Sequence, residues 1–211
     1  AFICEVKKAS PSKGIIAKDF PYVEIAKEYE ASGANAISVL TEPDYFKGSV
    51  DFLKEISKNV DIPLLRKDFI IDEIQIYEAK VIRASAILLI CAILDEDTLK
   101  RYFKIADDLG MSVLVEAHDE EEIQKAIRCG ARIVGVNNRN LKDFTVDINN
   151  SINLRKSVDE DIIFVSESGI KNSKDIKRLV ENNVNAVLIG ETLMKCSDKA
   201  AMIKDLKSEV V

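Results

Sequence analysis

The chain has 211 residues, of which 47% are hydrophobic and 31% charged, with a formal net charge of −6 at pH 7. This acidic balance gives no reason to expect a nucleic-acid partner, and the longest apolar run, residues 86–94, is too short for a bilayer span of about 20 residues. No signal or transit segment is recognisable, so we expect a cytoplasmic protein with no membrane partner.

Eight short apolar segments along the chain predict β-strands. In chain order they are Phe2–Val6, Ala36–Leu40, Pro63–Arg66, Ala86–Ile90, Ser112–Val115, Ile133–Val136, Ile162–Val165 and Ala186–Ile189. Amphipathic patterns between them predict helices, among them Tyr22–Ser32, Glu120–Cys129 and Ser173–Asn182. Because strands and helices alternate without a linker or low-complexity stretch, we predict a single α/β domain over residues 1–211, a (βα)8 TIM barrel.

The helical patterns also predict which residues face the core. Ser173 is the predicted N-cap of the third of these helices. The predicted inward stripes are Val23, Ile25, Ala26 and Tyr29 in the first helix, Ile123, Ala126 and Ile127 in the second, and Ile176, Leu179 and Val180 in the third.

One sequence pattern recurs where helices lead into strands. Residues 33–39, 130–136 and 183–189 each begin with Gly or Asn, which tolerate the left-handed conformation that ends a helix, and then enter an apolar strand. The corresponding residue in the copy at 83–89 is Arg83, for which a left-handed conformation would cost about 1 kcal/mol or more. Unless this joint adopts another geometry, we expect Arg83 to reduce stability rather than catalysis, because such joints lie opposite the catalytic face.

Ionisable side chains stand at the ends of several predicted strands. Glu5 and Lys7 share one face of the first strand because side chains alternate, and Lys67 and Glu116 follow the third and fifth strands. In a barrel these ends meet at the catalytic face. Burial and opposite charges shift the pKa values of such groups in opposing directions, which suits general acid–base catalysis near neutral pH. A ring of solvated ion pairs is the alternative.

The last two predicted strands run into turns that contain glycine. One is Glu167-Ser168-Gly169-Ile170, and the other begins Gly190-Glu191 and opens a short helical stretch. Barrels of this class often bind a phosphate group between these two loops, at the N-terminus of an extra helix. We expect the backbone N–H of Glu191 to face the phosphate while its side chain turns away, with Arg139 and Lys7 supplying positive charge.

Other residues receive less specific interpretations. His118, the only histidine, follows Glu116 and is expected at the surface beside a solvated helix start at residues 119–122, and a histidine-based metal site is excluded by count. Tyr45, Phe46 and Phe69 would either pack locally or wall a flat hydrophobic substrate. The cysteines form no Cys-x-x-Cys pair and are expected to be buried reduced thiols: Cys4, Cys91, Cys129 and Cys196.

Several of these segments together resemble the indole-3-glycerol phosphate synthase family of tryptophan biosynthesis. The matching segments run through the whole chain in order: residues 5–12 (EVKKASPS), 38–42 (SVLTE), 45–49 (YFKGS), 65–69 (LRKDF), 88–90 (LLI), 115–116 (VE), 135–141 (GVNNRNL), 167–170 (ESGI) and 188–191 (LIGE). The phosphate turns alone would fit several barrel families.

The resemblance implies a reaction and a set of roles. The family closes the ring of an anthranilate-derived aminodeoxyribulose phosphate, releasing CO2 and water, and uses no metal or organic cofactor. By motif, Lys67 resembles the general acid, Glu116 and Lys7 serve proton transfers, Glu5 positions Lys7, and Asn137 holds the substrate hydroxyl and catalytic groups. The implied phosphate and polar shell is Arg139, Glu167, Ser168, Gly169, Gly190 and Glu191, and the implied lining of the aromatic end is Ser10, Phe46, Phe69 and Leu88.

Two departures and two alternatives accompany this resemblance. The sequence starts at Ala1 without the helical segment that family members usually carry before the first strand, so we expect a wetter pocket with a raised KM and a reduced kcat. Arg83-Ala84-Ser85 replaces the family's Gly-Ala-Asp.

A Schiff-base aldolase or isomerase using Lys67 or Lys7, and a sugar-phosphate-binding barrel with little turnover, remain alternatives. We expect a monomer that acts on a small phosphorylated substrate, with other tryptophan-pathway enzymes as the candidate protein partners.

Overall fold

The computed structural model describes residues 1–140 and 143–209, and Leu141 of the family motif lies outside them. Its principal strands form a closed parallel barrel in the order β1-β10-β9-β8-β7-β6-β5-β4, so the predicted TIM barrel is confirmed. The strands are β1 (Phe2–Val6), β4 (Ala36–Leu40), β5 (Leu64–Lys67), β6 (Ala86–Ile90), β7 (Ser112–Ala117), β8 (Ile133–Asn137), β9 (Ile163–Glu167) and β10 (Ala186–Ile189).

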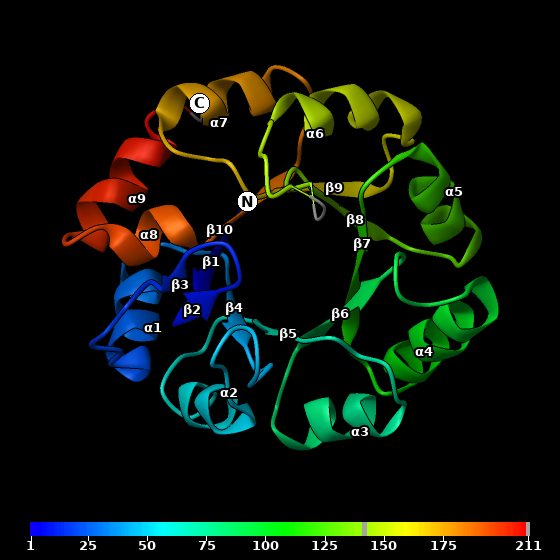
Figure 1. Cartoon of the computed structure of the whole chain (residues 1–211), viewed down its shortest axis with the longest axis horizontal. Helices are drawn as coiled ribbons and strands as arrows, with labels where there is room; N and C mark the ends of the chain where they lie inside the picture. Colours follow the sequence, from blue (N-terminus) through cyan, green and yellow to red (C-terminus); the bar gives the residue numbers. More distant parts are fainter. Residues whose placement is uncertain (141–142, 210–211) are drawn as a thin grey trace.

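Helices surround this barrel as an outer ring (Figure 1). They are α1 (Tyr22–Ala31), α2 (Val50–Ile56), α3 (Ile74–Val81), α4 (Glu96–Asp108), α5 (Glu120–Arg128), α6 (Asn149–Leu154) with the 3-10 turn η1 (Arg155–Ser157), α7 (Ser173–Val180), α8 (Glu191–Lys195) and α9 (Lys199–Lys207). A small antiparallel hairpin, β2 (Ala9–Ser10) with β3 (Gly14–Ile15), follows β1. Within the described ranges, no helix is long and apolar enough to cross a membrane.

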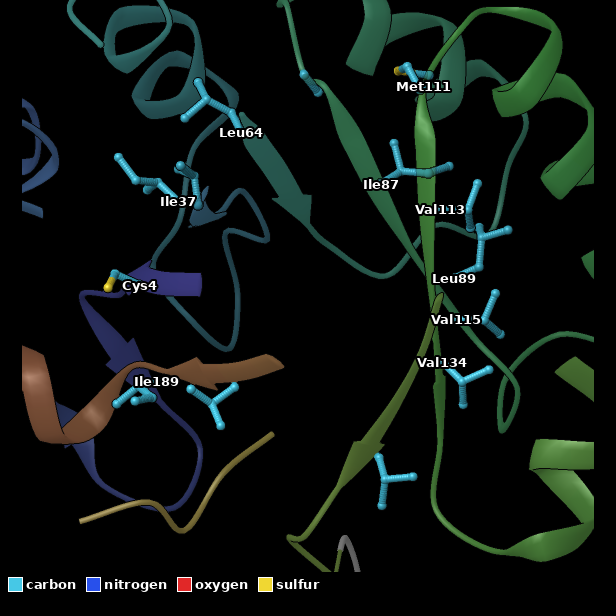
Figure 2. Packing of buried hydrophobic residues seen from close by; sticks show 14 of the residues in the cluster. Cys4, Ile37, Leu64, Ile87, Leu89, Met111, Val113, Val115, Val134 and Ile189 are labelled. Atoms are coloured by element: carbon cyan, nitrogen blue, oxygen red, sulfur yellow. The ribbon is translucent and has the colours of Figure 1, made fainter. Parts of the chain in front are cut away.

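The apolar residues form two layers, one on each face of the barrel wall. The outer layer packs strands against helices, and Figure 2 shows Ile87 and Leu89 of β6 near Val113 and Val115 of β7 in this layer. The inner layer fills the barrel with side chains from the alternate positions, namely Leu65, Leu88, Ile90, Leu114, Val165, Ala186 and Leu188. Both faces of each strand are therefore buried, which explains the nearly continuous apolar runs in the sequence.

Several strands extend past their predicted ends, to Lys67, Ala117, Asn137 and Glu167. The sequence interpretation ended these strands at the first polar side chain. In the barrel, however, the strands continue through Lys67, Glu116, Asn137 and Glu167, whose side chains border the cavity and find polar partners there. The polar residues are therefore parts of the strands rather than of the loops, which fixes their positions more rigidly.

Two expectations for the helix at residues 173–180 are wrong. Asn172, not Ser173, is the N-cap: its side chain accepts from the N–H groups of Lys174 and Asp175, and Asp175 completes a capping box. Val180 is 41% exposed, because it lies one position past the buried Leu179 at the edge of the apolar stripe.

The helix-to-strand joints have the expected left-handed geometry, including the one at Arg83. The φ angles are 82° at Gly33, 87° at Gly130 and 59° at Asn183, and Arg83 has a φ of 69°. The alternative of a different backbone geometry at Arg83 is therefore excluded. Its strain is on the order of 1 kcal/mol, since a Cβ in this conformation approaches the following carbonyl oxygen.

All four cysteines are free. Cys4, Cys91 and Cys129 are buried as expected, whereas Cys196 is partly exposed after α8. Burial raises the pKa of the Cys4 and Cys91 thiols to about 12, so neither provides a thiolate near neutral pH.

Candidate active site

A cavity of about 620 Å³ opens at the carboxyl ends of the barrel strands. Every site residue predicted from the sequence lines it: Glu5, Lys7, Ser10, Phe46, Lys67, Phe69, Leu88, Glu116, Asn137, Arg139, Glu167, Ser168, Gly169, Gly190 and Glu191. The residues come from many segments far apart in the chain, so the barrel closure itself assembles this set.

The alternation of side chains along the strands explains why charged groups stand at the bottom of the cavity. Lys67 follows Leu65 by two positions, and Glu116 follows Leu114 in the same way, so each shares an inward face with a residue of the inner apolar layer. The apolar layer fills the barrel below Lys67 and Glu116, and Leu88, Ile90 and Leu188 of this layer also border the cavity. The charged side chains at the strand ends, among them Lys67 and Glu116, therefore form a charged floor of the cavity that lies on the apolar layer inside the barrel.

Lys67 lies at the centre of this floor between two carboxylates. Its Nζ is 3.3 Å from Oε2 of Glu116 and 3.3 Å from Oε2 of Glu167. Burial lowers the pKa of Lys67, but the attraction of Glu167 and Glu116 outweighs it, so the net pKa lies above the ordinary lysine value. Lys67 is therefore an ammonium group throughout the neutral range and a permanent hydrogen-bond donor.

Glu167 is held in an unusual environment for a carboxylate. Its residue is 2% exposed, and its Oε1 has no hydrogen-bond partner among the described residues. Burial raises the pKa of Glu167 to about 7, against the attraction of Lys67 and with added repulsion from Glu116. Gly135 makes room for it, because a Cβ there would lie 2.3 Å from Oε1 of Glu167. The sequence interpretation grouped Glu167 with the substrate shell, whereas its carboxylate contacts Lys67.

Glu5 and Lys7 form a second ion pair on the opposite wall. Oε1 of Glu5 is 2.7 Å from Nζ of Lys7, and Ser38 Oγ donates to Oε2 at 3.4 Å. Burial raises the pKa of Glu5, but Lys7 and Lys67 lower it further, so the net pKa is below the ordinary value. Gly190 lies against this pair, because a Cβ on it would come within 2.3 Å of Glu5 Oε1 and 2.9 Å of Lys7 Nζ.

Asn137 connects the charged floor to the glycine turn after β9. Its Nδ2 donates to Oε1 of Glu116 at 3.3 Å, while its Oδ1 accepts from Ser168 Oγ at 3.0 Å and from the Arg139 N–H at 3.1 Å. One amide thus fixes both the carboxylate of Glu116 and the start of the turn that carries Ser168.

The two turns after β9 and β10 contain glycine and lie beside positively charged side chains. Ser168 and Gly169 both have left-handed backbones, with φ angles of 69° and 86°. The side chain of Glu191 turns to Lys195, at 2.6 Å, and lies 3.7 Å from the guanidinium of Arg139. Ser168, Gly169, Gly190 and Glu191 all line the cavity, and the Glu191 carboxylate is paired with positive charge.

An aromatic wall stands on the other side of the cavity. Phe46 and Phe69 form this wall, with ring centroids 6.2 Å apart, whereas the exposed Tyr45 packs on Phe69 at 6.3 Å and is not among the residues that line the cavity. Glu42, which belongs to the family motif at residues 38–42 but received no role from the sequence, shapes this wall: its buried carboxylate accepts from the backbone N–H groups of Asp44, Tyr45 and Phe46. A carboxylate directly after a strand and before a short loop was the available signal.

The expectation that His118 is a surface residue is wrong. Its side chain is only 18% exposed, with Nε2 at 3.6 Å from Glu116 Oε1 and Nδ1 at 3.1 Å from Glu122 Oε2. The helix start that follows is as expected in one respect, since Asp119 caps α5 by accepting from the Glu122 N–H. Glu122 itself faces the imidazole rather than solvent alone, because α5 begins directly beside the end of β7.

The loops contribute lining residues that no sequence motif indicated. They include Lys13 from the turn between β2 and β3, Ile93 after β6, and Phe144 and Val146 after β8. Their placement depends on the paths of the loops over the mouth, which periodicity does not predict.

The parallel eight-stranded barrel, its acid–base floor and its glycine turns after β9 and β10 are features of TIM-barrel enzymes that act on phosphorylated small molecules. A solved 3-hexulose-6-phosphate synthase from Salmonella typhimurium has this fold, with a TM-score of 0.80 at 15% identity, covering 99% of this chain and 97% of that one. Residues 1–206 match the family model for indole-3-glycerol phosphate synthase. The chain belongs to this family.

Curated relatives carry the same name. The indole-3-glycerol phosphate synthase of Ruminiclostridium cellulolyticum is 63% identical over 206 residues, covering 98% of this chain and 79% of the relative. That of Endomicrobium trichonymphae is 62% identical over 206 residues, covering 98% of this chain and 80% of the relative. The resemblance seen in the sequence motifs is therefore confirmed across nearly the whole chain.

Proposed function

We propose that this chain catalyses the ring closure of 1-(2-carboxyphenylamino)-1-deoxyribulose 5-phosphate to indole-3-glycerol phosphate, with loss of CO2 and water. The observation that carries the proposal is the position of Lys67, a buried ammonium group between two carboxylates in a cavity with an aromatic wall on one side and glycine turns on the other. A substrate with an aromatic ring at one end and a phosphate at the other matches this polarity.

The two ends of the cavity would orient the substrate. Phe46 and Phe69 offer flat apolar surfaces for the anthranilate ring, with Leu88 and Ser10 completing that end. Arg139 and the N–H groups of Ser168, Gly169, Gly190 and Glu191 would bind the phosphate. The carbonyl carbon of the substrate would then lie over the charged floor, and holding both ends lowers the entropic cost of bringing the reacting carbons together.

Lys67 is the proposed general acid for ring closure. As the aromatic carbon that bears the carboxylate attacks the carbonyl carbon, the carbonyl oxygen gains charge, and Lys67 Nζ would donate its proton there. The carboxylate then leaves as CO2, and its bonding electrons restore the aromatic ring. Glu116 and Glu167 hold Nζ in place, at 3.3 Å each, so the donor is oriented before the substrate arrives.

Glu116 and Lys7 are the proposed groups for the dehydration that completes the indole. One hydroxyl leaves as water with a proton from an ammonium group, and a carboxylate accepts the proton released from the ring system. Glu5 fixes Lys7 through the 2.7 Å ion pair, and Asn137 fixes Glu116 and reaches toward the substrate hydroxyl. None of these steps draws on a metal or an organic cofactor. We propose that a monomer is the active unit, because the cavity of a single chain holds all the groups that these proposed steps use.

The proposal is tested by incubating the chain with the carboxyphenylamino-deoxyribulose phosphate and following indole fluorescence and CO2 release. The expected result is stoichiometric formation of both products without added metal. Binding of the substrate without either product would contradict the proposal and favour a binding barrel.

The Schiff-base alternative requires a different protonation state of the same lysine. Imine formation needs a neutral amine, which enzymes obtain by lowering the lysine pKa, whereas the pKa of Lys67 is raised by its two carboxylates. Borohydride treatment in the presence of substrate separates the mechanisms. Acid–base ring closure leaves no reducible imine, so trapped covalent adduct on Lys67 or Lys7 would support the alternative.

A further inference from the structure

We propose that His118 is a positioning residue for Glu116, held in place by Glu122. This inference rests on the proposed function, in which Glu116 transfers a proton. The imidazole lies at the end of β7, between the catalytic floor and the first turn of α5, with one ring nitrogen toward each carboxylate.

The ring is anchored on its outer side. Oε2 of Glu122 accepts from the His118 backbone N–H at 2.8 Å and lies 3.1 Å from Nδ1 of the same residue. Glu122 is itself fixed, because its N–H donates to the N-cap carboxylate of Asp119 at 2.9 Å. From α6, Asn150 donates to the His118 carbonyl oxygen at 3.3 Å. Backbone and ring are therefore both restrained.

The inner ring nitrogen has one partner to which it can turn. Nε2 of His118 is buried, has no hydrogen-bond partner among the described residues, and lies 3.6 Å from Oε1 of Glu116. Carboxylate oxygens accept only, so two flanking carboxylates are satisfied when both ring nitrogens carry hydrogen. Hydrogen bonds at catalytic sites are often long before substrate binds, and a shift of a few tenths of an ångström would close this one.

Glu116 then has a donor on each accessible side. Lys67 approaches Oε2, while Asn137 and His118 approach Oε1. Without His118, the carboxylate keeps both other donors but loses its support on the side away from the cavity and can rotate out of line with the substrate. The lost alignment concerns the chemical step, whereas the phosphate turns and the aromatic wall, which supply binding, stay in place. His118 should therefore affect kcat more than KM.

Two substitutions separate the ring nitrogens. In His118→Gln the amide nitrogen takes the place of Nε2 and still donates toward Glu116, whereas in His118→Asn the amide nitrogen takes the place of Nδ1 and only the contact with Glu122 remains. We expect His118→Asn to lower kcat about tenfold, the effect of one lost hydrogen bond to a charged group, with KM unchanged within about twofold. We expect His118→Gln to retain at least about half of the wild-type kcat.

Glu122→Gln provides a second route to the same result and serves if His118→Asn unfolds. It removes the charge that anchors Nδ1, so kcat should fall in the same direction while the melting temperature and KM stay close to wild type. Glu121→Gln, an exposed neighbour in the same helical turn, is the matched control and should leave kcat unchanged. In the double variant of His118→Asn and Glu122→Gln, the losses should not add, because both act through one contact.

The outcomes are distinct. Wild-type kcat in a folded His118→Asn chain would overturn the positioning role while leaving the proposed function intact. Equal losses of kcat in His118→Gln and His118→Asn would also overturn it, because His118→Gln keeps a hydrogen-bond donor toward Glu116 and should then retain activity. An inactive wild-type chain would remove the proposed function and this inference with it.

Discussion

Nζ of Lys67 and Oε2 of Glu167 lie 3.3 Å apart, and the second oxygen of Glu167 is buried without a hydrogen-bond partner among the described residues. The ion pair with Lys67 therefore provides a partner for only one of the two oxygens of the Glu167 carboxylate. Burial raises the pKa of Glu167 to about 7, while Lys67 remains charged. The protein carries the cost of a partly satisfied charge at the position where its proposed general acid has to be held.

This environment predicts a pH dependence of stability. A glutamate titrates at about 4.3 in an unfolded chain, so between that value and about 7 the folded protein holds more protons at Glu167. The stability that comes from this group is fully present below about pH 4 and is lost as the pH rises through about 7. Glu167→Gln does not titrate and should lack the effect.

The measurement is the free energy of unfolding of both proteins between about pH 5 and pH 8. The stability of the wild type minus that of Glu167→Gln should fall by on the order of 2 kcal/mol over this range. Glu160→Gln, an exposed carboxylate, is the control and should give a constant difference. A difference for Glu167→Gln that is flat or rises with pH would contradict the raised pKa.

A second prediction concerns the left-handed Arg83. Arg83→Gly removes the contact between Cβ and the following carbonyl oxygen at a φ of 69°, and this gain exceeds the greater freedom of glycine in the unfolded chain. We expect a net stabilisation of about 0.5 kcal/mol, or a rise in Tm of about 1–2 °C for a chain of this size. Activity should not change, since the joint lies opposite the cavity.

Asn183→Gly is the matched control for this prediction. Asn183 has a φ of 59°, but asparagine tolerates the left-handed region, so its replacement should raise Tm by less than Arg83→Gly does. An unchanged or lower Tm for Arg83→Gly would refute the strained joint.

A third prediction concerns the phosphate end of the cavity. Arg139→Ala should raise KM about tenfold to a hundredfold, because a charge-assisted hydrogen bond to the phosphate contributes about 1.5–3 kcal/mol. kcat should change less, since the acid–base floor stays in place. Arg128→Ala, which removes an exposed arginine on α5 paired with Glu96, should leave both constants unchanged. A large fall in kcat with wild-type KM would move Arg139 from phosphate binding to the chemistry.

The sequence predicted the barrel and the charged strand ends of the cavity from periodicity, whereas Ser10 and Leu88 were implied only by the family resemblance. Strands with apolar runs that end in a polar residue place Lys67 and Glu116 on one inward face wherever the barrel closes. The left-handed helix-to-strand joints were also predictable, because Gly or Asn occupies the left-handed position in each of them except at Arg83.

What the sequence did not reveal depends on contacts between segments. The partner of Glu167 is set by the strand register, and the space for its carboxylate comes from Gly135 on a neighbouring strand. His118 was expected in solvent because the residues after it are acidic, but α5 begins close enough to β7 to enclose the ring. The loop residues over the mouth have no periodic signal.

The central claim is that Lys67 is the general acid of a ring closure, and Lys67→Ala tests it most directly. Indole fluorescence from the carboxyphenylamino-deoxyribulose phosphate is followed for the wild type, for Lys67→Ala and for Lys104→Ala, an exposed lysine on α4. We predict product from the wild type and the Lys104 variant, and a loss of at least about a hundredfold in kcat for Lys67→Ala, which should still bind a reduced, unreactive analogue of the substrate. Product formation by a folded Lys67→Ala chain at the wild-type rate would contradict the account.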